Sequence, residues 1–440
     1  MTRKMFSRIL GAASALSLAW AFGTGAVLAQ TTENDPVSIT NIPFLDMPLE
    51  TASEKSPYYG PVTGAGAAAG QNGSPKHLPD SIWHLAGYAQ AGAFITNGDK
   101  NDSFMEGKFS PGFHFLYKEV IMFEAELEIE TEDGETKVAL EYSQLDWLVL
   151  DNTTLIFGKF LSPIGLFRER LHPGWINKLP SAPVGFGHGG VQPLSEIGFQ
   201  VRGVMPLSSG EPFESARITY ALMVGNGPRL GHGGIELEGF SDDDNRNKSF
   251  GGRVAFLPVP YLEFGFSYLG ANVVGPEDHD TEENLVGNYD LIGFDASYTR
   301  SSFDIRFEFL DSRIRGLEDE DHLIAAVGRL VPLSVGPEEE AELLETNADW
   351  RAWYAQAAYR LDGISDHRII KNLEPVIRYG RLRQSGNHEL EEANENQLTL
   401  GLNYWLAPSA ALKLAVQLRD FRDPDRADET IFQFQVVYGF

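Results

Sequence analysis

Phe432-Gln433-Phe434-Gln435-Val436-Val437-Tyr438-Gly439-Phe440 is the stretch that decides the fold. Its even-numbered positions are all apolar, and four of these five residues are aromatic. Because successive side chains of a strand point to opposite faces, this run predicts a strand with one continuous apolar face. A water-soluble domain has little reason to end on such a face, whereas a strand that closes a barrel in lipid requires it. We therefore expect Tyr438 and Phe440 to act as an assembly signal on the lipid face of the last strand.

The same alternation recurs from Ser81 to the end of the chain. In Phe303–Phe309 four apolar residues alternate with three charged ones, and Phe123–Glu130 places four glutamates on one side. Counting such runs gives about sixteen, the weakest being those near residues 104, 350 and 373. They begin near residues 82, 104, 120, 137, 153, 195, 216, 249, 261, 289, 303, 350, 373, 397, 411 and 430. The pattern predicts an all-β fold, a transmembrane antiparallel up-and-down β-barrel of about 16 strands over residues 81–440.

The lengths of the connections favour the same architecture. The tight-turn sequences are Lys118-Glu119, Asp151-Asn152, Pro258-Val259-Pro260, Ser301-Ser302 and Ala407-Pro408-Ser409-Ala410. We expect all other connections to be longer, with extremes at about 162–194 and 314–348. Short turns at one end and long loops at the other are typical of an outer-membrane barrel. If the last strand ends in the periplasm, an even strand count places the short turns at the periplasmic end and the long loops outside.

The first 80 residues are predicted to lie outside the barrel. Arg3, Lys4 and Arg8 precede an apolar stretch, and Val27-Leu28-Ala29 has the small residues of a cleavage site. We expect a signal peptide over residues 1–29, cleaved near Ala29, and a flexible Gly-, Ala- and Pro-rich leader over residues 30–80. An uncleaved membrane anchor is the alternative for the first segment. No later stretch has the long apolar run of a transmembrane helix.

Composition narrows the class of protein further. The formal net charge is −27, and the charged residues of the predicted signal peptide are all basic, so its cleavage makes the chain more negative. This acidic balance argues against nucleic acid as a partner. Cys is absent, so disulfides, thiol nucleophiles and cysteine metal sites are excluded. A soluble β-sandwich would also have alternating strands. That alternative does not predict the alternation of short and long connections or the terminal aromatic residue.

The long connection that follows Gly158 has the most distinctive local sequence. It contains apolar residues that could pack against an inner wall, namely Ile164, Leu166, Phe167, Trp175 and Ile176. It is also locally basic in an acidic protein, through Arg168, Arg170, Lys178 and, when protonated, His172. We predict that these four residues form a pore constriction. A salt-bridge anchor to an acidic wall is the alternative role for Arg168 and Arg170.

Two features resemble known outer-membrane proteins. A strand ending in Phe440 resembles the end of bacterial outer-membrane barrels, and Gly158-Lys159-Phe160-x-x-Pro163-x-Gly165 resembles porins related to the phosphate-selective family. The resemblance implies localisation in the outer membrane of a Gram-negative bacterium and a long third external loop, residues 162–194, folded into the lumen. The phosphate-selective channels line their pore with a ladder of Arg and a Lys cluster. This sequence mixes acids and bases instead, so anion selectivity is not carried over.

The strand faces expected to point inward carry charges of both signs. Candidate lumen-wall residues are Glu124, Glu126, Glu128, Glu130, Glu196, Arg202, Arg306, Glu308, Lys413 and Arg419. Any water-filled lumen has a polar wall. These charged residues could therefore be solvated wall residues without a specific role, or they could select the substrate. The long loops are acidic, as at Glu277–Glu283 and Glu338–Glu345, and are either a solvated surface or bridged by divalent cations to lipopolysaccharide.

Local enzyme signatures are absent from the sequence. There is no G-x-S-x-G elbow, H-E-x-x-H helix or Walker loop, so we expect no enzymatic activity, cofactor or metal site. The predicted function is that of a porin, passive diffusion of small hydrophilic solutes or ions through a charged, water-filled lumen. A non-conducting barrel, structural or hydrolytic, is the alternative. Expected partners are outer-membrane lipid, lipopolysaccharide, the barrel assembly machinery and the solutes, with a homotrimer as an option and no nucleic acid.

Overall fold

The computed structural model describes the chain from Ser81 to its end, with several gaps. The described residues are 81–97, 103–132, 135–187, 190–207, 215–228, 230–231, 234–235, 248–274, 285–315, 347–385, 394–423 and 426–440. The predicted signal peptide, its cleavage near Ala29 and the leader over residues 30–80 lie outside these residues. Most of the acidic external loops lie outside them too.

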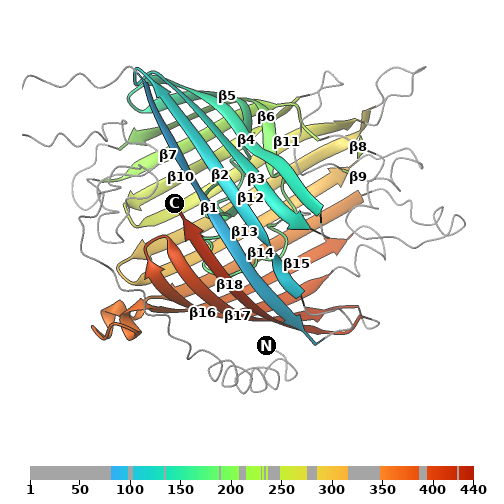
Figure 1. Cartoon of the computed structure of the whole chain (residues 1–440). Coiled ribbons are helices and arrows are strands. Elements are labelled where there is room, and N and C mark those ends of the chain that lie inside the picture. The colour runs from blue at the N-terminus through green and yellow to red at the C-terminus, as the bar shows by residue number, and fades with distance from the viewer. Residues whose placement is uncertain are drawn as a thin grey trace, which may run out of the picture.

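A closed antiparallel β-barrel of 16 strands makes up the described part of the chain (Figure 1). Its strands are β1 (Ser81–Thr96), β2 (Ser103–Tyr117), β3 (Ile121–Glu132), β4 (Glu135–Leu150), β5 (Thr153–Leu161), β6 (Ser195–Pro206), β7 (Arg217–Gly225), β10 (Ser249–Val259), β11 (Leu262–Val274), β12 (Leu285–Arg300), β13 (Phe303–Arg315), β14 (Asn347–Tyr359), β15 (Leu373–Ser385), β16 (Glu395–Ala407), β17 (Ala410–Phe421) and β18 (Glu429–Gly439). The short strands β8 (Leu230–Gly231) and β9 (Gly234–Ile235) pair only with each other. The all-β fold and the strand count predicted from the sequence are confirmed.

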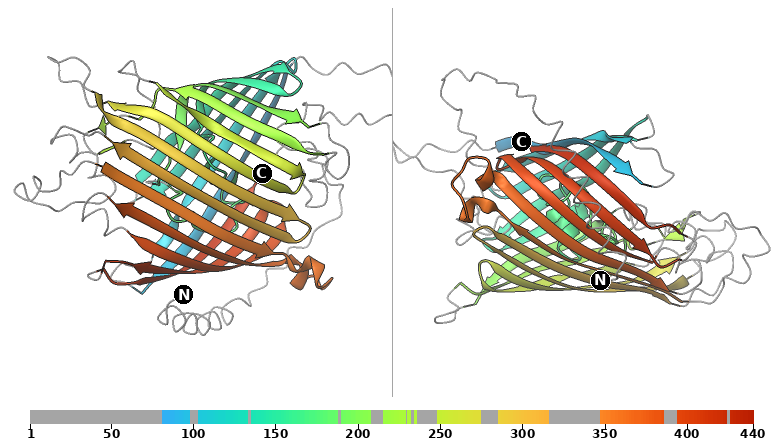
Figure 2. Two further views of the ribbon diagram at one scale, coloured as in Figure 1. Left: turned by 180° about the vertical axis from the view of Figure 1, so that it is seen from behind. Right: turned by 90° about the horizontal axis from the view of Figure 1, so that it is seen from below.

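The first and last strands close the barrel. β1 and β18 pair antiparallel from Tyr88 opposite Gly439 to Thr96 opposite Ile431. Phe440 extends the pairing, because its N–H donates to the Gly87 carbonyl at 2.9 Å and its carbonyl accepts from the Gly87 N–H at 3.0 Å. Every other barrel strand pairs with the strands next to it in the chain, except that β7 pairs with β10 across the β8–β9 hairpin. The two views in Figure 2 show the strands running obliquely around the barrel.

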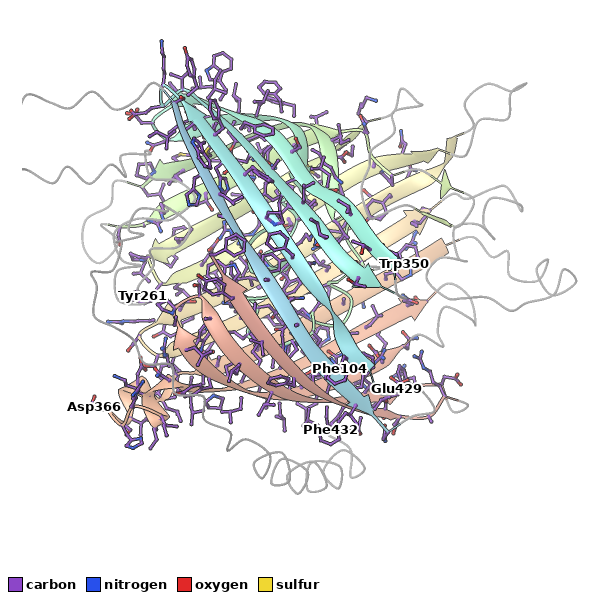
Figure 3. The ribbon with its side chains drawn as sticks, viewed as in Figure 1. Phe104, Tyr261, Trp350, Asp366, Glu429 and Phe432 are labelled. Atoms are coloured by element: carbon purple, nitrogen blue, oxygen red, sulfur yellow. The ribbon has the colours of Figure 1, made fainter. Side chains whose placement is uncertain are left out.

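The predicted length of one connection, that between β3 and β4, is wrong. β3 ends at Glu132 and β4 begins at Glu135, so only two residues join them at the end where longer connections were expected. Those residues are Asp133-Gly134, and Asp-Gly is a preferred sequence for a two-residue hairpin. At the opposite end, the tight turns follow Tyr117, Leu150, Val259, Arg300 and Ala407 as predicted. Figure 3 shows Tyr261 and Asp366, from two connections, at this same end.

Each strand has an outer apolar face and an inner polar one. On β13, Phe303 and Ile305 are 48% and 45% exposed, whereas Asp304 and Glu308 between and beyond them are buried. On β18, Phe434, Val436 and Tyr438 are exposed while Gln435 and Val437 are buried. Figure 3 shows Phe104 and Phe432 on the outer side of the ribbon. Within the described ranges, no helix has both the length and the apolar character needed to cross a membrane.

Candidate functional site

The connection between β5 and β6, residues 162–194, carries all four predicted constriction residues. We call it the β5–β6 segment; its residues 188–189 lie outside the described part. It contains one turn of π-helix, η2 (Phe167–Leu171). Although it belongs to no strand, many of its residues are buried, including Ser162 and Ile164, which expose nothing. A connection this well covered must have partners for its backbone and charged groups.

Glu308 of β13 holds the start of the β5–β6 segment. Its two carboxylate oxygens accept the backbone N–H groups of Leu166 at 2.8 Å and Phe167 at 3.0 Å. The hydroxyl of Tyr354 on β14 donates to the same carboxylate at 3.2 Å. Gly165 has φ +72°, and a Cβ atom there would lie 2.0 Å from Glu308 Oε1. The last glycine of the Gly-Lys-Phe motif is therefore required both by its backbone conformation and by the closeness of Glu308.

Apolar side chains of the segment join those of the barrel in one buried cluster. Ile164 and Phe186 are fully buried, and Leu166 and Phe167 nearly so. The Phe186 and Phe167 rings meet the Tyr354 ring edge-on, with centroids 5.0 and 6.4 Å apart. Ile164, Leu166 and Phe167, which the sequence analysis expected to pack against an inner wall, thus lie in one buried cluster with side chains of the strands. Edge-on pairs of this kind add to the stabilisation from area burial alone.

Both predicted constriction arginines are paired with carboxylates from strands. Arg168 Nη2 lies 2.7 Å from Glu141 Oε2 on β4, and both side chains are buried. Arg168 Nε also donates to the Leu194 carbonyl at 3.0 Å. Arg170 Nη1 lies 3.0 Å from both oxygens of Glu263 on β11. The salt-bridge anchor considered from the sequence is thus present in the structure, with Glu141 as a partner that the sequence reading missed.

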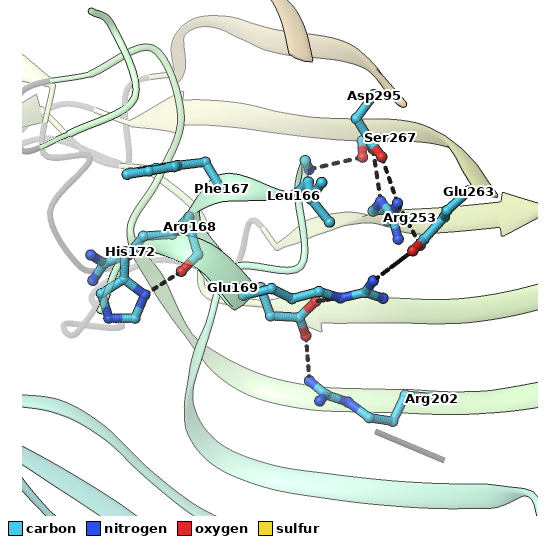
Figure 4. Close-up of polar contacts among 12 residues, drawn as sticks. Leu166, Phe167, Arg168, Glu169, His172, Arg202, Arg253, Glu263, Ser267 and Asp295 are labelled. Atoms are coloured by element: carbon cyan, nitrogen blue, oxygen red, sulfur yellow. Dashed lines mark hydrogen bonds and ion pairs between the residues drawn. The ribbon is translucent and has the colours of Figure 1, made fainter. Parts of the chain in front are cut away.

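The Arg170–Glu263 pair belongs to a longer chain of alternating charges, in which Figure 4 labels Glu169, Arg202, Arg253, Glu263 and Asp295. Arg253 of β10 lies 2.8 Å from Glu263 and 2.6 Å from Asp295 of β12. At the other end, Arg202 of β6 lies 2.9 Å from Glu169 of η2. The predicted wall residue Arg202 therefore contacts the segment. Since each cation has a carboxylate neighbour, this network carries little net charge.

His172 differs from the sequence prediction. Its Nδ1 lies 2.6 Å from the Arg168 carbonyl, and its side chain is largely enclosed. Burial, with a further contribution from the Arg168 charge, lowers the pKa of His172 to about 3. His172 is therefore neutral at physiological pH. The protonated form considered from the sequence does not add to the positive charge of the segment.

The C-terminal half of the segment is held by β15, β16 and β17. Lys178 Nζ lies 2.8 Å from Glu374 Oε1, and Asn403 donates to Glu374 at 3.0 Å and to the Lys178 carbonyl at 2.9 Å. Lys413, a predicted wall residue, donates to the carbonyl of Asn177 at 2.5 Å and also to that of Gly174. Lys178 and Lys413 are thus both engaged in fixing the segment.

A cavity of about 130 Å³ remains between the segment and the opposite strands. Its polar lining comes mainly from His114 of β2, Glu124 and Glu126 of β3, Gln144 of β4 and Arg202 of β6. Glu169, Pro173, Trp175 and Ile176 of the segment face it. Two predicted wall glutamates and one predicted wall arginine therefore share one cavity.

The remaining predicted wall residues have local partners. Glu128 lies 2.5 Å from Lys108, and Arg306 lies 2.6 Å from Asp304. Glu196 is fully buried and accepts the Asn226 N–H at 2.9 Å and the Ser249 hydroxyl at 2.7 Å. Arg419 lies 2.8 Å from Glu395 and 2.9 Å from Glu429. Glu130 is partly buried opposite Lys108 in the β2–β3 register.

The two predicted assembly residues lie on the outer face. Tyr438 is 52% exposed. The Phe440 ring stacks on Phe109 of β2 with centroids 5.9 Å apart and lies 6.2 Å from the Tyr438 ring. Their common surface is the same apolar face that the sequence pattern identified. Their part in assembly stays a prediction.

Within the part of the chain that the structure describes, no group of three or more His, Cys, Asp or Glu residues is arranged to hold a metal ion. The predicted absence of a metal site and cofactor stays a prediction, because acidic loops lie outside the described ranges.

Comparison with known proteins finds similarity in fold. An anion-selective porin from Comamonas acidovorans superposes with a TM-score of 0.50 at 13% identity, over 82% of this chain and 100% of that chain. The outer membrane channel DcaP of Acinetobacter baumannii gives 0.48 at 12% identity, over 82% and 97% of the two chains. OmpT, an outer membrane protein of Vibrio cholerae, gives 0.49 at 11% identity, over 82% and 98%.

At these identities the likeness extends to the barrel fold alone. No protein-family model matches the sequence, and no curated protein matches it either. The resemblance to the phosphate-selective porins therefore stays a prediction.

Proposed function

We propose that this protein is an outer-membrane porin through which small hydrophilic solutes diffuse passively. The observation that carries the proposal is the apolar outer surface of a closed barrel. Phe113 on β2 is 44% exposed, and Phe266 and Phe294, which are paired on the neighbouring strands β11 and β12, are 54% and 44% exposed. A soluble monomer rarely exposes a continuous apolar surface of this extent, whereas the lipid-facing band of a membrane barrel consists of one.

We infer further that the β5–β6 segment lies inside the barrel and narrows its lumen. Its partners come from the inner polar faces of strands as far apart around the barrel as β4, β11, β13, β15 and β17. A connection outside the barrel could not reach the inner faces of all of these strands, because the wall would lie between them. The segment then leaves a path for water and solutes only where it does not contact the wall.

The proposed localisation and assembly rest on the same outer surface. A barrel with this apolar face would insert into the outer membrane of a Gram-negative bacterium after cleavage of the signal peptide near Ala29. It would there contact lipid and lipopolysaccharide. A homotrimer is the proposed oligomer, to be measured by sedimentation of the detergent-solubilised protein.

A non-conducting barrel is the second candidate, favoured by the extent of packing around the segment. Ile164, Phe186 and Tyr354 form part of one buried apolar cluster, and such packing could close the lumen rather than narrow it. A structural or hydrolytic protein would need no open path. Conductance separates the two candidates, because only the porin passes ions.

The proposal is tested by recording the full-length protein in a planar lipid bilayer. We expect stepwise, ohmic conductance increments after insertion. Shortening the segment between Ile164 and Lys178 should raise the single-channel conductance and admit larger uncharged solutes in a liposome-swelling assay. A folded, heat-modifiable barrel that inserts but passes no ions would overturn the porin proposal in favour of the non-conducting barrel.

A further inference from the structure

We propose that ions cross the barrel through the cavity between the β5–β6 segment and strands β2, β3, β4 and β6, and that this passage selects small cations. The inference rests on the proposed porin function and deepens it by assigning the passage and the sign of its selectivity. It stands on the balance of paired and unpaired charges around the segment.

The first step is that the basic side chains of the segment carry no unopposed charge. Arg168 is paired with Glu141 at 2.7 Å, Arg170 with Glu263 at 3.0 Å and Lys178 with Glu374 at 2.8 Å. A close ion pair presents a dipole to a passing ion, and its field falls off faster than that of a single charge. These cations therefore contribute little attraction for anions.

The second step is that the carboxylates of the cavity outnumber its cations. Glu124, Glu126 and Glu169 line it together with a single arginine, Arg202. Arg202 is already bound to Glu169 at 2.9 Å and to Gln200 at 2.7 Å. The lining of the cavity thus contains three carboxylates and one arginine, an excess of acidic side chains.

The third step concerns Glu126 itself. Its side chain lines the cavity, the residue is only 8% exposed, and its Oε1 has no hydrogen-bond partner among the described residues. A buried polar atom without a partner is costly, and such atoms in folded proteins need an explanation from water, an ion or function. A hydrated cation in the cavity would supply the missing interaction.

Glu124, the second β3 glutamate of the cavity lining, is held by a neutral amide. It accepts a hydrogen bond from Gln144 Nε2 at 3.2 Å, and the His114 ring lies 3.6 Å away. Gln144 also donates to Asp146 at 2.8 Å, so a third carboxylate lies directly behind the lining. The hydrogen bond from Gln144 holds the Glu124 carboxylate in place beside the cavity. An excess of fixed carboxylates beside one passage favours cations over anions.

The size of the cavity limits what can pass in this conformation. A volume of about 130 Å³ has room for several water molecules around a small ion. Larger solutes would require the segment to move. The structure therefore fits small inorganic or organic cations, and potassium is the probe for the test.

The experiment is the reversal potential of wild-type channels in a potassium chloride gradient, recorded in mildly alkaline buffer so that carboxylates are ionised. The test variant is Glu124→Gln combined with Glu126→Gln, which keeps the side-chain shapes. The matched control is Glu395→Gln, which removes a carboxylate from the inner face of β16 where Arg419 keeps a second partner in Glu429. Heat-modifiability on a gel checks that each variant is folded.

We expect the wild type to prefer potassium over chloride. The cation-to-anion permeability ratio should fall by about twofold for each charge removed from the cavity. The control should keep the wild-type ratio. Wild-type selectivity for chloride, or an unchanged ratio in the double variant, would overturn the cation passage while leaving a conducting porin. Absence of conductance in the folded wild type would overturn the porin function itself, and the cation passage with it.

Discussion

The strands on the two sides of the β5–β6 segment meet it in different ways. On one side, Glu308 of β13, Glu374 of β15 and Lys413 of β17 bind backbone or side-chain groups of the segment directly. On the other side, Glu124 and Glu126 of β3 face a cavity, and one oxygen of Glu126 has no hydrogen-bond partner in the part of the chain that the structure describes. We call these the anchoring side and the open side.

We infer from this difference that inward charges can serve two purposes in one barrel, anchoring the segment and lining a passage. A buried charged group is stable when its polar atoms have partners, and Glu308, Glu374 and Lys413 find such partners in the segment. On the open side, Glu126 Oε1 has no hydrogen-bond partner among the described residues. Where a buried polar group of a folded protein lacks a hydrogen-bond partner, the site is a candidate for function rather than for stability.

The largest expected loss of stability comes from breaking an ion pair on the anchoring network. Arg168→Gln leaves Glu141 buried without its cation, and breaking a buried pair costs about 3–5 kcal/mol. Urea unfolding of the barrel in vesicles, followed by Trp fluorescence, measures the free energy of unfolding. The variant should also raise single-channel conductance, because the segment loses one attachment to β4.

The matched control for this variant is Arg313→Gln. Arg313 pairs with Asp311 at 2.9 Å, but its side chain is half exposed, and Arg351 gives Asp311 a second partner at 3.0 Å. An exposed pair of this kind is worth about 0–1 kcal/mol. Equal losses in the two variants would mean that Arg168 does not anchor the segment.

A second prediction compares the interior with the lipid face. Phe307 lies on the outer face of β13, and Arg306 on the inner face is paired with Asp304. Phe307→Arg should cost about 2–4 kcal/mol near the membrane midplane, falling towards zero near the interface. Arg306→Gln should cost clearly less. A smaller cost for Phe307→Arg than for Arg306→Gln in the same unfolding assay would show that the two faces have been assigned the wrong way round.

The barrel was predictable from sequence because its signal is local and repeated. All sixteen strands begin within four residues of the positions that the alternation indicated, including the weak runs at β2, β14 and β15. A strand buries one face and exposes the other. Each segment of about ten residues therefore shows in its own sequence which side chains point outward and which point inward. The short connection between β3 and β4 was missed, although the sequence Asp133-Gly134 is typical of such a connection.

The contacts of the segment were not predictable in the same way. Glu308 binds backbone N–H groups about 140 residues away in the chain, and no local pattern marks such a pair. Glu141 was missed because of a bulge. Glu126 pairs with Tyr142 and Leu127 with Leu140, so Glu141 is the extra residue and the alternation of β4 shifts there. Counting by twos from Trp147 would place Glu141 on the outer face.

A third, smaller effect is expected at the closure of the barrel. Deleting Phe440 removes its two backbone hydrogen bonds to Gly87 and its stacking on Phe109. These contacts together should contribute about 1–3 kcal/mol, and their loss should lower the yield of folded, heat-modifiable barrel in the outer membrane. Phe440→Ala keeps the backbone bonds and should lose less. If deletion left the folded yield unchanged, Phe440 would have no part in closure.

The smallest effect on stability is expected on the open side, and it has the opposite sign. Glu126→Gln changes a buried carboxylate whose Oε1 has no hydrogen-bond partner within the described ranges, so the free energy of unfolding should stay within about 0.5 kcal/mol of wild type or increase. Glu308→Gln is the matched change on the anchoring side. It weakens acceptance of the Leu166 and Phe167 N–H groups and should cost about 1–3 kcal/mol. Glu126→Gln should instead change ion selectivity while the barrel remains as stable as before. If Glu126→Gln destabilised the barrel as much as Glu308→Gln, the Glu126 carboxylate would be a structural anchor, and the division into an anchoring and an open side would fail.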